Sequence, residues 1–374
     1  MAMAMGLLLA LPARGEVFPS AGAVPEDVKW TAEELLARMS LREKVGQLFV
    51  IRPEKLSFNA NDQRVEGGKT RVTDTMRAAY ARYPVGGFVL FSDNISDEAQ
   101  LRGFLSDLRG MCAVTPILAV DEEGGTVARL ANKSALGIEN VGNMLAIGKT
   151  GDTQRAYDAG AAIGGYLADY GFTLDFAPVA DLSGGAIGSR AFGRDPQLVS
   201  GMVSAFIDGL HSKGVQSCIK HFPGHGTVSG DTHKGFVSQN KTGAELMATD
   251  LVPFIGNFAK TDVVMVAHIS LTRASSDNLP ASLSRNIITG GLRGSLGYNG
   301  VVITDSLEMG AVTNQYKSAE AAARAFDAGV DLLLMPSSII SAFDDMVQAV
   351  EQGAISEARL DESVLRILRL KLGE

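Results

Sequence analysis

The sequence predicts a (β/α)8 barrel of the TIM type, built as a single domain. Eight short apolar runs rich in β-branched residues alternate with longer amphipathic stretches, and polar side chains gather just after several of these runs. Near-continuous apolar runs indicate strands that are buried on both faces, as in a parallel sheet covered by helices. Eight strand–helix units fit a closed barrel, whereas a doubly wound sheet with two sub-domains is the alternative.

The composition is that of a folded globular protein. The 374 residues are 46% hydrophobic and 20% charged, which excludes a disordered chain. The formal net charge of the chain is −8, whereas proteins that bind nucleic acid or anionic membranes usually carry an excess of basic residues. No nucleic-acid partner is therefore expected. Two cysteines, Cys112 and Cys218, cannot form a disulfide framework.

Residues 1–25 are expected to be a tail and linker, and the barrel is assigned to residues 26–374. Residues 1–13 are uncharged and mostly apolar. They resemble the h-region of a signal peptide, and they are too short to span a bilayer. We therefore expect no stable membrane span, and export to the periplasm or the outside is slightly favoured over the cytoplasm.

The first helices are marked by their caps. Thr31 with Glu34, and Ser40 with Glu43, have the spacing of capping boxes, in which a hydroxyl and a carboxylate satisfy free backbone N–H groups. The predicted strands follow at residues 45–51, 85–91, 116–120, 172–176, 215–219, 263–267, 300–304 and 330–335.

Two later helices have clear ends. Residues 317–328 are predicted to form a crossover helix, with Ser318 as its N-cap and Gly329 just past its last turn. Residues 360–372 carry an apolar stripe and are predicted to form the last helix.

Polar side chains cluster at the carboxyl ends of five predicted strands. They lie in segments 121–129, 177–196 and 220–233, at His268, and in segment 305–309. The loops at this end of a barrel converge, and active sites form there. The sequence therefore predicts one site that draws on five different strands.

Segment 220–233 holds three of the five histidines, and three chemistries could use it. His221, His225 and His233 could ligate zinc. Lys220 could form a Schiff base at the end of its strand. His233, oriented by Asp231, could transfer protons.

Asp305 is the second centre of interest. It follows the apolar run 300–304, so its carboxyl group is expected near the barrel mouth. Arg129, Arg190 and Lys220 should project into the same mouth and favour the ionised form. Such a carboxylate can act as a nucleophile or a metal ligand, and the alternative is a cap for the following helix.

Several motifs together resemble glycoside hydrolase family 3, in its bacterial single-domain β-N-acetylglucosaminidase branch. The most specific is Lys220-His-Phe-Pro-Gly-His-Gly, followed after four residues by Asp231-Thr-His233. The similarity extends in order over residues 32–372, through the motifs at 121–129, 190–196, 280–284, 300–309 and 328–336.

This resemblance implies a single catalytic (β/α)8 domain that removes terminal β-linked N-acetylglucosamine with retention of configuration. It implies that Asp305 is the nucleophile and that His233, paired with Asp231, is the general acid/base. The sugar in the −1 subsite would be bound by the residues Asp121, Arg129, Arg190, Lys220, His221 and Met309.

The resemblance also implies that the enzyme needs no metal and no cofactor, and a monomer is expected. The substrate would be a carbohydrate with a non-reducing terminal N-acetylglucosamine, derived from peptidoglycan or from chitin. Hydrolysis is expected, with phosphorolysis as an alternative acceptor chemistry. A relative with another sugar preference and a non-catalytic sugar-binding protein are the other functional alternatives.

Three further polar residues lie in or near the predicted elements. Glu123 is expected to be a buried hydrogen-bond partner for the motif loops. His268 could equally bind substrate or satisfy a hydrogen bond in the core. His211 is expected to be an exposed helix residue.

Overall fold

The computed structural model describes residues 30–226, 228, 235 and 237–374. Residues Thr31–Glu374 form one compact unit, and this unit contains the whole barrel. The expected tail 1–25, and its boundary at residue 26, lie outside the described residues. Within the described ranges, no helix combines the length and the apolarity needed to cross a membrane.

The core of the unit is an eight-stranded parallel sheet that closes on itself. Its strands, in sheet order, are β11 (Val301–Thr304), β9 (Val263–Val266), β7 (Gln216–Phe222), β6 (Leu174–Asp175), β3 (Ile117–Val120), β2 (Gly87–Leu90), β1 (Phe49–Ile51) and β12 (Leu333–Leu334). A parallel bridge between Ile303 and Leu332 joins the first strand to the last. The predicted barrel is therefore confirmed, and the doubly wound alternative is wrong.

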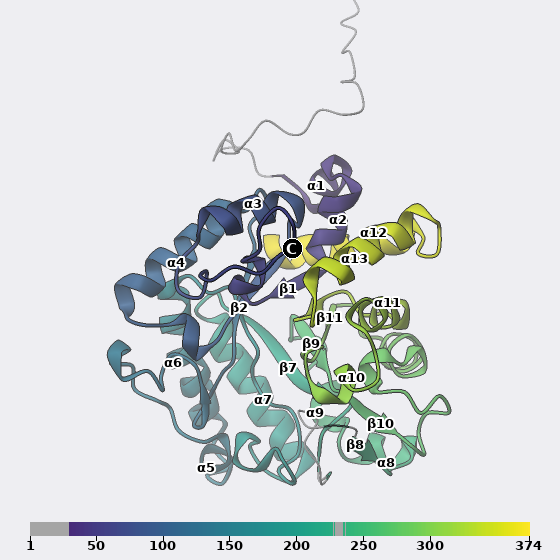
Figure 1. Ribbon diagram of the computed structural model, residues 1–374. Helices are drawn as coiled ribbons and strands as arrows, with labels where there is room; N and C mark the ends of the chain where they lie inside the picture. Colours follow the sequence, from purple (N-terminus) through teal and green to yellow (C-terminus); the bar gives the residue numbers. More distant parts are fainter. Residues whose placement is uncertain (1–29, 227, 229–234, 236) are drawn as a thin grey trace, which may run out of the picture. The chain divides into compact units, whose positions relative to one another are not determined.

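Helices surround the strands on the outside (Figure 1). They are α1 (Ala32–Arg38), α2 (Leu41–Gln47), α3 (Asp74–Arg82), α4 (Glu98–Met111), α5 (Met144–Gly148), α6 (Thr153–Tyr170), α7 (Pro196–His211), α8 (Gly243–Ala248), α9 (Val252–Ile255), α10 (Gly310–Thr313), α11 (Ser318–Ala328), α12 (Ile339–Glu351) and α13 (Glu357–Leu372). A π-helix at Asn286–Ser295 lies between β9 and β11 in the chain. Short strand pairs, β4 (Glu122–Gly124) with β5 (Val127–Ala128) and β8 (Val237–Gln239) with β10 (Ile269–Leu271), follow the carboxyl ends of the barrel strands.

The local signals in the sequence are largely confirmed. Both capping boxes, at Thr31 and at Ser40, are formed. Gly329 ends α11 with a φ of 112°, a left-handed conformation that glycine adopts without steric cost.

Several boundaries differ from the prediction, among them those of α2 and α11. Residues 45–47 of the first predicted strand are the last turn of α2, where all three are buried, because a short buried segment can belong to a helix as well as to a strand. The N-cap of α11 is Lys317 instead of Ser318. The Ser318 hydroxyl instead donates to the carbonyl of Ser338 and accepts from its N–H, at 3.1 and 2.9 Å.

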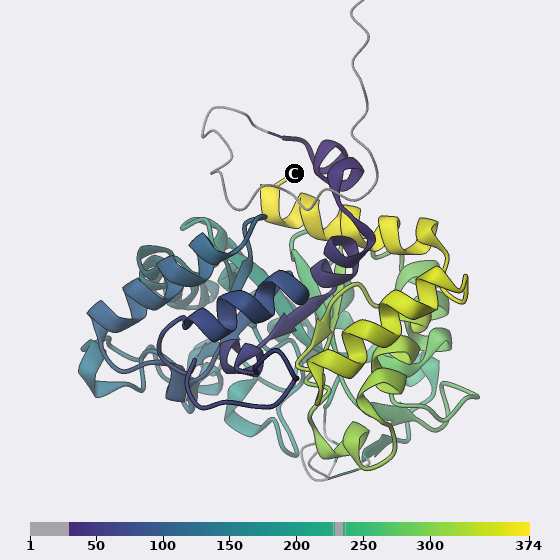
Figure 2. The ribbon, with the colours of Figure 1, turned by 45° about the horizontal axis from the view of Figure 1, so that its top comes forward.

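The two ends of the unit pack against each other. Figure 2 shows α13 running beside α1 and α2, and these helices are in contact. Lys44 Nζ on α2 lies 2.7 Å from Asp361 Oδ1 on α13. The last helix thus covers the amino-terminal end of the barrel, away from the carboxyl ends of the strands.

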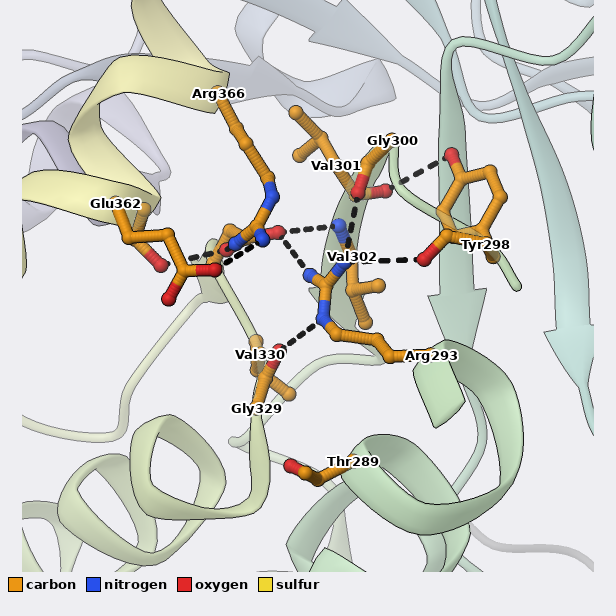
Figure 3. A network of polar contacts seen from close by, with 12 residues as sticks. Thr289, Arg293, Tyr298, Gly300, Val301, Val302, Gly329, Val330, Glu362 and Arg366 are labelled. Atoms are coloured by element: carbon orange, nitrogen blue, oxygen red, sulfur yellow. Dashed lines mark hydrogen bonds and ion pairs between the residues drawn. The ribbon is translucent and has the colours of Figure 1, made fainter. Parts of the chain in front are cut away.

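A buried carboxylate ties this end together. Asp331, just before β12, is fully buried. Its Oδ2 accepts from Arg293 Nη2 at 2.5 Å and from the N–H of Val302 at 2.9 Å, and its Oδ1 accepts from Ser363 Oγ at 2.5 Å and Arg366 Nη1 at 3.2 Å. Figure 3 shows Arg293 and Arg366 approaching from the π-helix and from α13. The contacts join β11, β12 and α13 where the barrel closes.

Replacing Asp331 by Ala should therefore destabilise the fold strongly. Loss of one partner of a buried ion pair leaves uncompensated charge, which costs about 3 to 5 kcal/mol. Urea denaturation measures this change in the free energy of unfolding. Glu320→Ala, which breaks only the exposed pair with Arg324, should cost about 0.5 kcal/mol or less. Equal losses in both variants would contradict this role for Asp331.

Candidate active site

A cavity of about 470 Å3 opens at the carboxyl ends of the strands. The predicted site residues within the described ranges all line it, namely Asp121, Arg129, Arg190, Lys220, His221, Asp305 and Met309. They come from the loops after β3 and β6, from β7 itself and from the loop after β11. The other two predicted residues, Asp231 and His233, lie outside the described residues.

Strand β7 carries the two polar residues of the motif on its own backbone. The sequence predicted a strand ending at residue 219, but β7 continues through Lys220 and His221 to Phe222. Phe222 pairs with Val266 of β9, and Lys220 pairs with Val179 on the other side. The neighbouring strands thus fix the direction in which Lys220 and His221 leave the sheet.

Lys220 is a buried cation held between two carboxylates. Its side chain is 2% exposed, and its Nζ lies 2.8 Å from Asp121 Oδ1 and 2.6 Å from Glu123 Oε1. Arg190 binds Glu123 through two hydrogen bonds of 2.6 and 2.7 Å. Arg129 Nη2 lies 3.3 Å from Asp121 Oδ2. Cations and carboxylates therefore alternate along one wall of the cavity.

These contacts keep the groups ionised. Burial by itself raises the pKa of Asp121 and Glu123, but Lys220 and the arginines more than offset it and hold both pKa values below their usual range. Burial by itself lowers the pKa of Lys220, and the two carboxylates raise it above its usual value. A protonated Lys220 has no lone pair for attack on a carbonyl group, which argues against the Schiff-base alternative.

Asp305 lies half-buried in the same cavity. Its backbone N–H donates to the carbonyl of Val266 at 2.9 Å, and its Oδ1 accepts from the N–H of Ser306 at 2.7 Å. Burial raises the pKa of this carboxyl, but the charges of His221 and His268, the Ser306 N–H and Lys220 lower it below its usual range. The helix-cap alternative is wrong, because α10 begins at Gly310 with Met309 as its N-cap.

The role of Asp181 was not predicted from the sequence. This fully buried residue accepts from Nδ1 of His221 at 2.7 Å and from the backbone N–H of the same residue at 3.1 Å. It also accepts from the N–H of His225 at 2.5 Å. The only signal in the sequence was its place after the fourth predicted strand, since nothing in the chain indicates which histidine it meets.

The turn after β7 is tightly packed. Gly224 and Gly226 have φ values of 113° and 48°, and a Cβ at these positions would lie 2.6 Å from Asp250 Cβ and 2.3 Å from Asp250 Oδ1. Glycine is therefore required here both for its backbone conformation and for space. This turn leads into the segment that contains Asp231 and His233.

The remaining predictions have clear outcomes. Glu123 is a buried partner, as predicted, and it binds both Lys220 and Arg190. His268 is fully buried, lies within 2.6 Å of Ser282 Oγ and donates through Nε2 to the carbonyl of Ser306 at 2.9 Å, which favours the core hydrogen-bond alternative. His211 is exposed at the end of α7, as predicted.

The zinc alternative depends on a residue outside the described ranges. Among the described side chains, no group of three or more His, Cys, Asp or Glu residues is arranged to hold a metal ion. Of the three histidines proposed as ligands, His221 and His225 are described. Nδ1 of His221 lies 2.7 Å from Asp181 Oδ2, whereas His225 meets Asp181 only through its backbone N–H. His233 is not among the described residues.

An ionised carboxylate beside charged and hydrogen-bonding groups, at the carboxyl-end mouth of a (β/α)8 barrel, is typical of barrel enzymes that act on small polar substrates. A family model described as "Glycosyl hydrolase family 3 N terminal domain" matches residues 40–370. The chain belongs to this family of glycoside hydrolases.

Similarities to individual proteins support this family assignment. A "Beta-hexosaminidase" of Tolumonas auensis is 38% identical over 262 residues, which cover 68% of this chain and 76% of that protein. A "Beta-hexosaminidase A" of Pseudoalteromonas piscicida is 31% identical over 324 residues, with 78% of this chain and 54% of that protein covered. The second relative is thus matched over about half of its length.

The solved structure of a glycoside hydrolase family 3 beta-N-acetylglucosaminidase from Paenibacillus sp. str. FPU-7 superimposes with a TM-score of 0.81 at 34% identity. The match covers 90% of this chain and 63% of that one. The resemblance predicted from the motifs is confirmed, and so is the barrel fold.

The alternating charges on this wall of the cavity, here called the ion-pair wall, predict how stability depends on pH. The wall consists of Arg129, Asp121, Lys220, Glu123 and Arg190. The pKa values of Asp121 and Glu123 are lower in the folded chain than their usual values of about 4. Their contribution is therefore complete above about pH 5 and is lost as the pH falls through the unfolded and then the folded pKa. Glu123→Gln should lower the melting temperature at about pH 7 and should flatten its decline between about pH 5 and pH 3.

Thermal unfolding across this pH range measures the effect. Glu320→Gln, the same substitution at an exposed pair, is the matched control and should follow the original protein. If the Glu123→Gln curve runs parallel to that of the original protein, then Glu123 is not a charged partner of Lys220 in the folded state.

Proposed function

We propose that the chain is a retaining, exo-acting β-N-acetylglucosaminidase. It would remove a terminal β-linked N-acetylglucosamine from saccharides derived from peptidoglycan or of the chitin type. The observation that carries this proposal is the half-buried Asp305 carboxylate, kept ionised inside a charged cavity of a family 3 barrel. The names of the relatives, hexosaminidase and beta-N-acetylglucosaminidase, supply the sugar class.

In the first step, an oxygen of Asp305 attacks the anomeric carbon of the sugar and the bond to the leaving oxygen breaks. This gives a covalent glycosyl-aspartate with inverted configuration at that carbon. Attack from a carboxylate requires that Asp305 be deprotonated, which the surrounding cations favour. A second inversion, by water, then restores the original configuration.

The departing oxygen needs a proton, and we assign this role to His233 with Asp231 as its partner. An imidazole is partly protonated near neutral pH, so it can donate in the first step. The neutral ring can then accept a proton from water in the second step. Glu308 is a second carboxyl group among the described residues that line the cavity with Asp305. Its ion pair with Lys55 favours its ionised form, which cannot donate a proton, so we do not assign it the acid role.

The ion-pair wall would bind the sugar itself. The ionised Asp121 carboxylate can only accept hydrogen bonds from sugar hydroxyls, a ring nitrogen of His221 can donate or accept, and Lys220, Arg129 and Arg190 supply donors only. Met309 lines the same cavity and offers an apolar surface. Because the ion pairs already fix these side chains, little conformational entropy is lost when the sugar binds.

Trapping of the covalent intermediate tests the nucleophile. A 2-deoxy-2-fluoro-glucosyl inactivator, in which fluorine replaces the acetamido group at C2, should add one label, and peptide mapping should find it on Asp305. Asp305→Asn should lose at least about a thousandfold in kcat/KM and should form no label. Glu308→Gln removes a carboxylate from the same cavity and should still be labelled. A label on another residue in the original protein would overturn the mechanism.

His233→Ala tests the acid. Substrates with poor leaving groups should lose about a hundredfold or more in rate, whereas aryl glycosides with acidic phenols should lose much less, because those phenols leave without a proton. A Brønsted plot of rate against leaving-group pKa measures this difference. Equal losses across the series would remove His233 from the acid role.

A further inference from the structure

Phe91 brings an uncharged aromatic ring to the cavity. It follows β2 directly, packs partly against the hydrophobic core and lines the cavity together with the ion-pair wall. Its backbone N–H donates to Oδ1 of Asn94 at 2.8 Å, which fixes the turn after the strand. The ring is therefore held in place from both the core and the backbone.

The ring of Phe91 meets a guanidinium group of the ion-pair wall. Cζ of Arg129 lies 5.1 Å from the centre of the ring, within the distance of about 6 Å at which an aromatic face attracts a cation. A second guanidinium, that of Arg52, lies 4.9 Å from the same centre. Arg52 has partners of its own, however, because its nitrogens lie 2.6 Å from Glu54 Oε1 and 2.7 Å from Asp93 Oδ2.

Arg129 is less firmly held than Arg190, the other arginine of the ion-pair wall. Arg190 makes two hydrogen bonds of 2.6 and 2.7 Å to Glu123. Nη2 of Arg129 lies 3.3 Å from Oδ2 of Asp121, and its buried Nε meets no hydrogen-bond acceptor among the described residues. Within this part of the chain, one long contact to a carboxylate and the face of Phe91 therefore hold the Arg129 guanidinium.

The remaining donors of Arg129 suit a polar ligand. A guanidinium carries five N–H groups and no acceptor, and the contact with Asp121 uses one of them. The others can donate to the oxygens of a sugar in the cavity. A long side chain that becomes ordered only when the ligand arrives loses rotamer freedom, and this loss weakens binding. A ring that orders the guanidinium beforehand reduces that loss.

We propose that Phe91 is a positioning residue for sugar binding: its ring holds the guanidinium of Arg129 beside Asp121, with N–H groups left for the sugar. The inference rests on the proposed function, since it needs a sugar in this cavity. Two alternatives predict other results. In the first, Phe91 only fills space at the edge of the core, and in the second, its ring contacts the sugar directly.

Fluorination of the Phe91 ring separates these alternatives. Fluorine withdraws electron density from the face of the ring and weakens its attraction for a cation, with little change of shape. Phenylalanines that carry one, two and three ring fluorines, incorporated in place of Phe91, should raise the KM for an aryl β-N-acetylglucosaminide step by step. The rise should reach about two- to fivefold with three fluorines. The value of kcat should change less, because Arg129 would contact the sugar before the transition state as well.

Arg129→Gln shows whether the effect passes through the guanidinium. This variant should raise KM by about tenfold or more, because charged donors to the sugar are lost. Fluorination of Phe91 in the same variant should then raise KM no further, since the ring would act through Arg129. Arg129→Met, with a chain of similar length, takes the place of Arg129→Gln if that variant fails to fold.

An aromatic–arginine pair elsewhere in the barrel supplies the matched control. The ring centre of Phe326 on α11 lies 4.2 Å from Cζ of Arg359 on α13, and neither residue lines the cavity. The same fluorinated residues in place of Phe326 should leave KM unchanged. Phe91→Tyr keeps an aromatic face and should stay near the original KM, whereas Phe91→Leu should raise KM about as much as three fluorines do.

The outcomes are distinct. A KM that stays constant along the fluorine series means that Phe91 only fills space, and it overturns the inference. A rise of the same size in the Arg129→Gln background overturns it as well, because the ring then acts on the sugar without the guanidinium. If the original protein cleaves no aryl β-N-acetylglucosaminide, the proposed function fails and the inference falls with it, and this result is visible before any variant is compared.

Discussion

The site depends on one buried cation. Lys220 is almost fully enclosed, and a lone ammonium group in that place would cost several kcal/mol. Asp121 and Glu123 offset this cost, and they in turn need Lys220 and Arg190 to remain ionised. The pairs stabilise one another only when all are present, so the loops after β3 and β6 are fixed against β7. A cavity with permanent charges on its wall, ready to meet a polar sugar, is the result.

The two ends of the barrel have different roles. At the carboxyl ends of the strands, charges line an open cavity and Asp305 stays partly accessible. At the amino-terminal end, Asp331 is fully enclosed and joins the seam of the barrel to the last helix. This arrangement matches the general separation in barrels between a catalytic face and a stabilising face.

Much of this could be predicted from the sequence. The apolar runs indicated all eight barrel strands, and the position of polar residues after them brought Asp121, Lys220 and Asp305 to one mouth. The end of β7 was missed because Lys220 and His221 are polar, and only the neighbouring strands show that they continue the ladder. The role of Asp181 was missed because it depends on a contact with His221, which lies 40 residues further along the chain. The strands can be predicted from local sequence patterns, whereas the pairing of charged residues depends on which segments the closed barrel brings together.

In the proposed mechanism, Asp305 attacks the sugar directly, so that two inversions preserve the configuration. Proton NMR of the first product released from an aryl β-N-acetylglucosaminide tests this most directly, because the anomeric protons of the two forms are resolved before they interconvert. We predict that the β-anomer of N-acetylglucosamine appears first and that the α-anomer grows in later by mutarotation. Initial release of the α-anomer would mean a single displacement by water, and it would contradict the role assigned to Asp305.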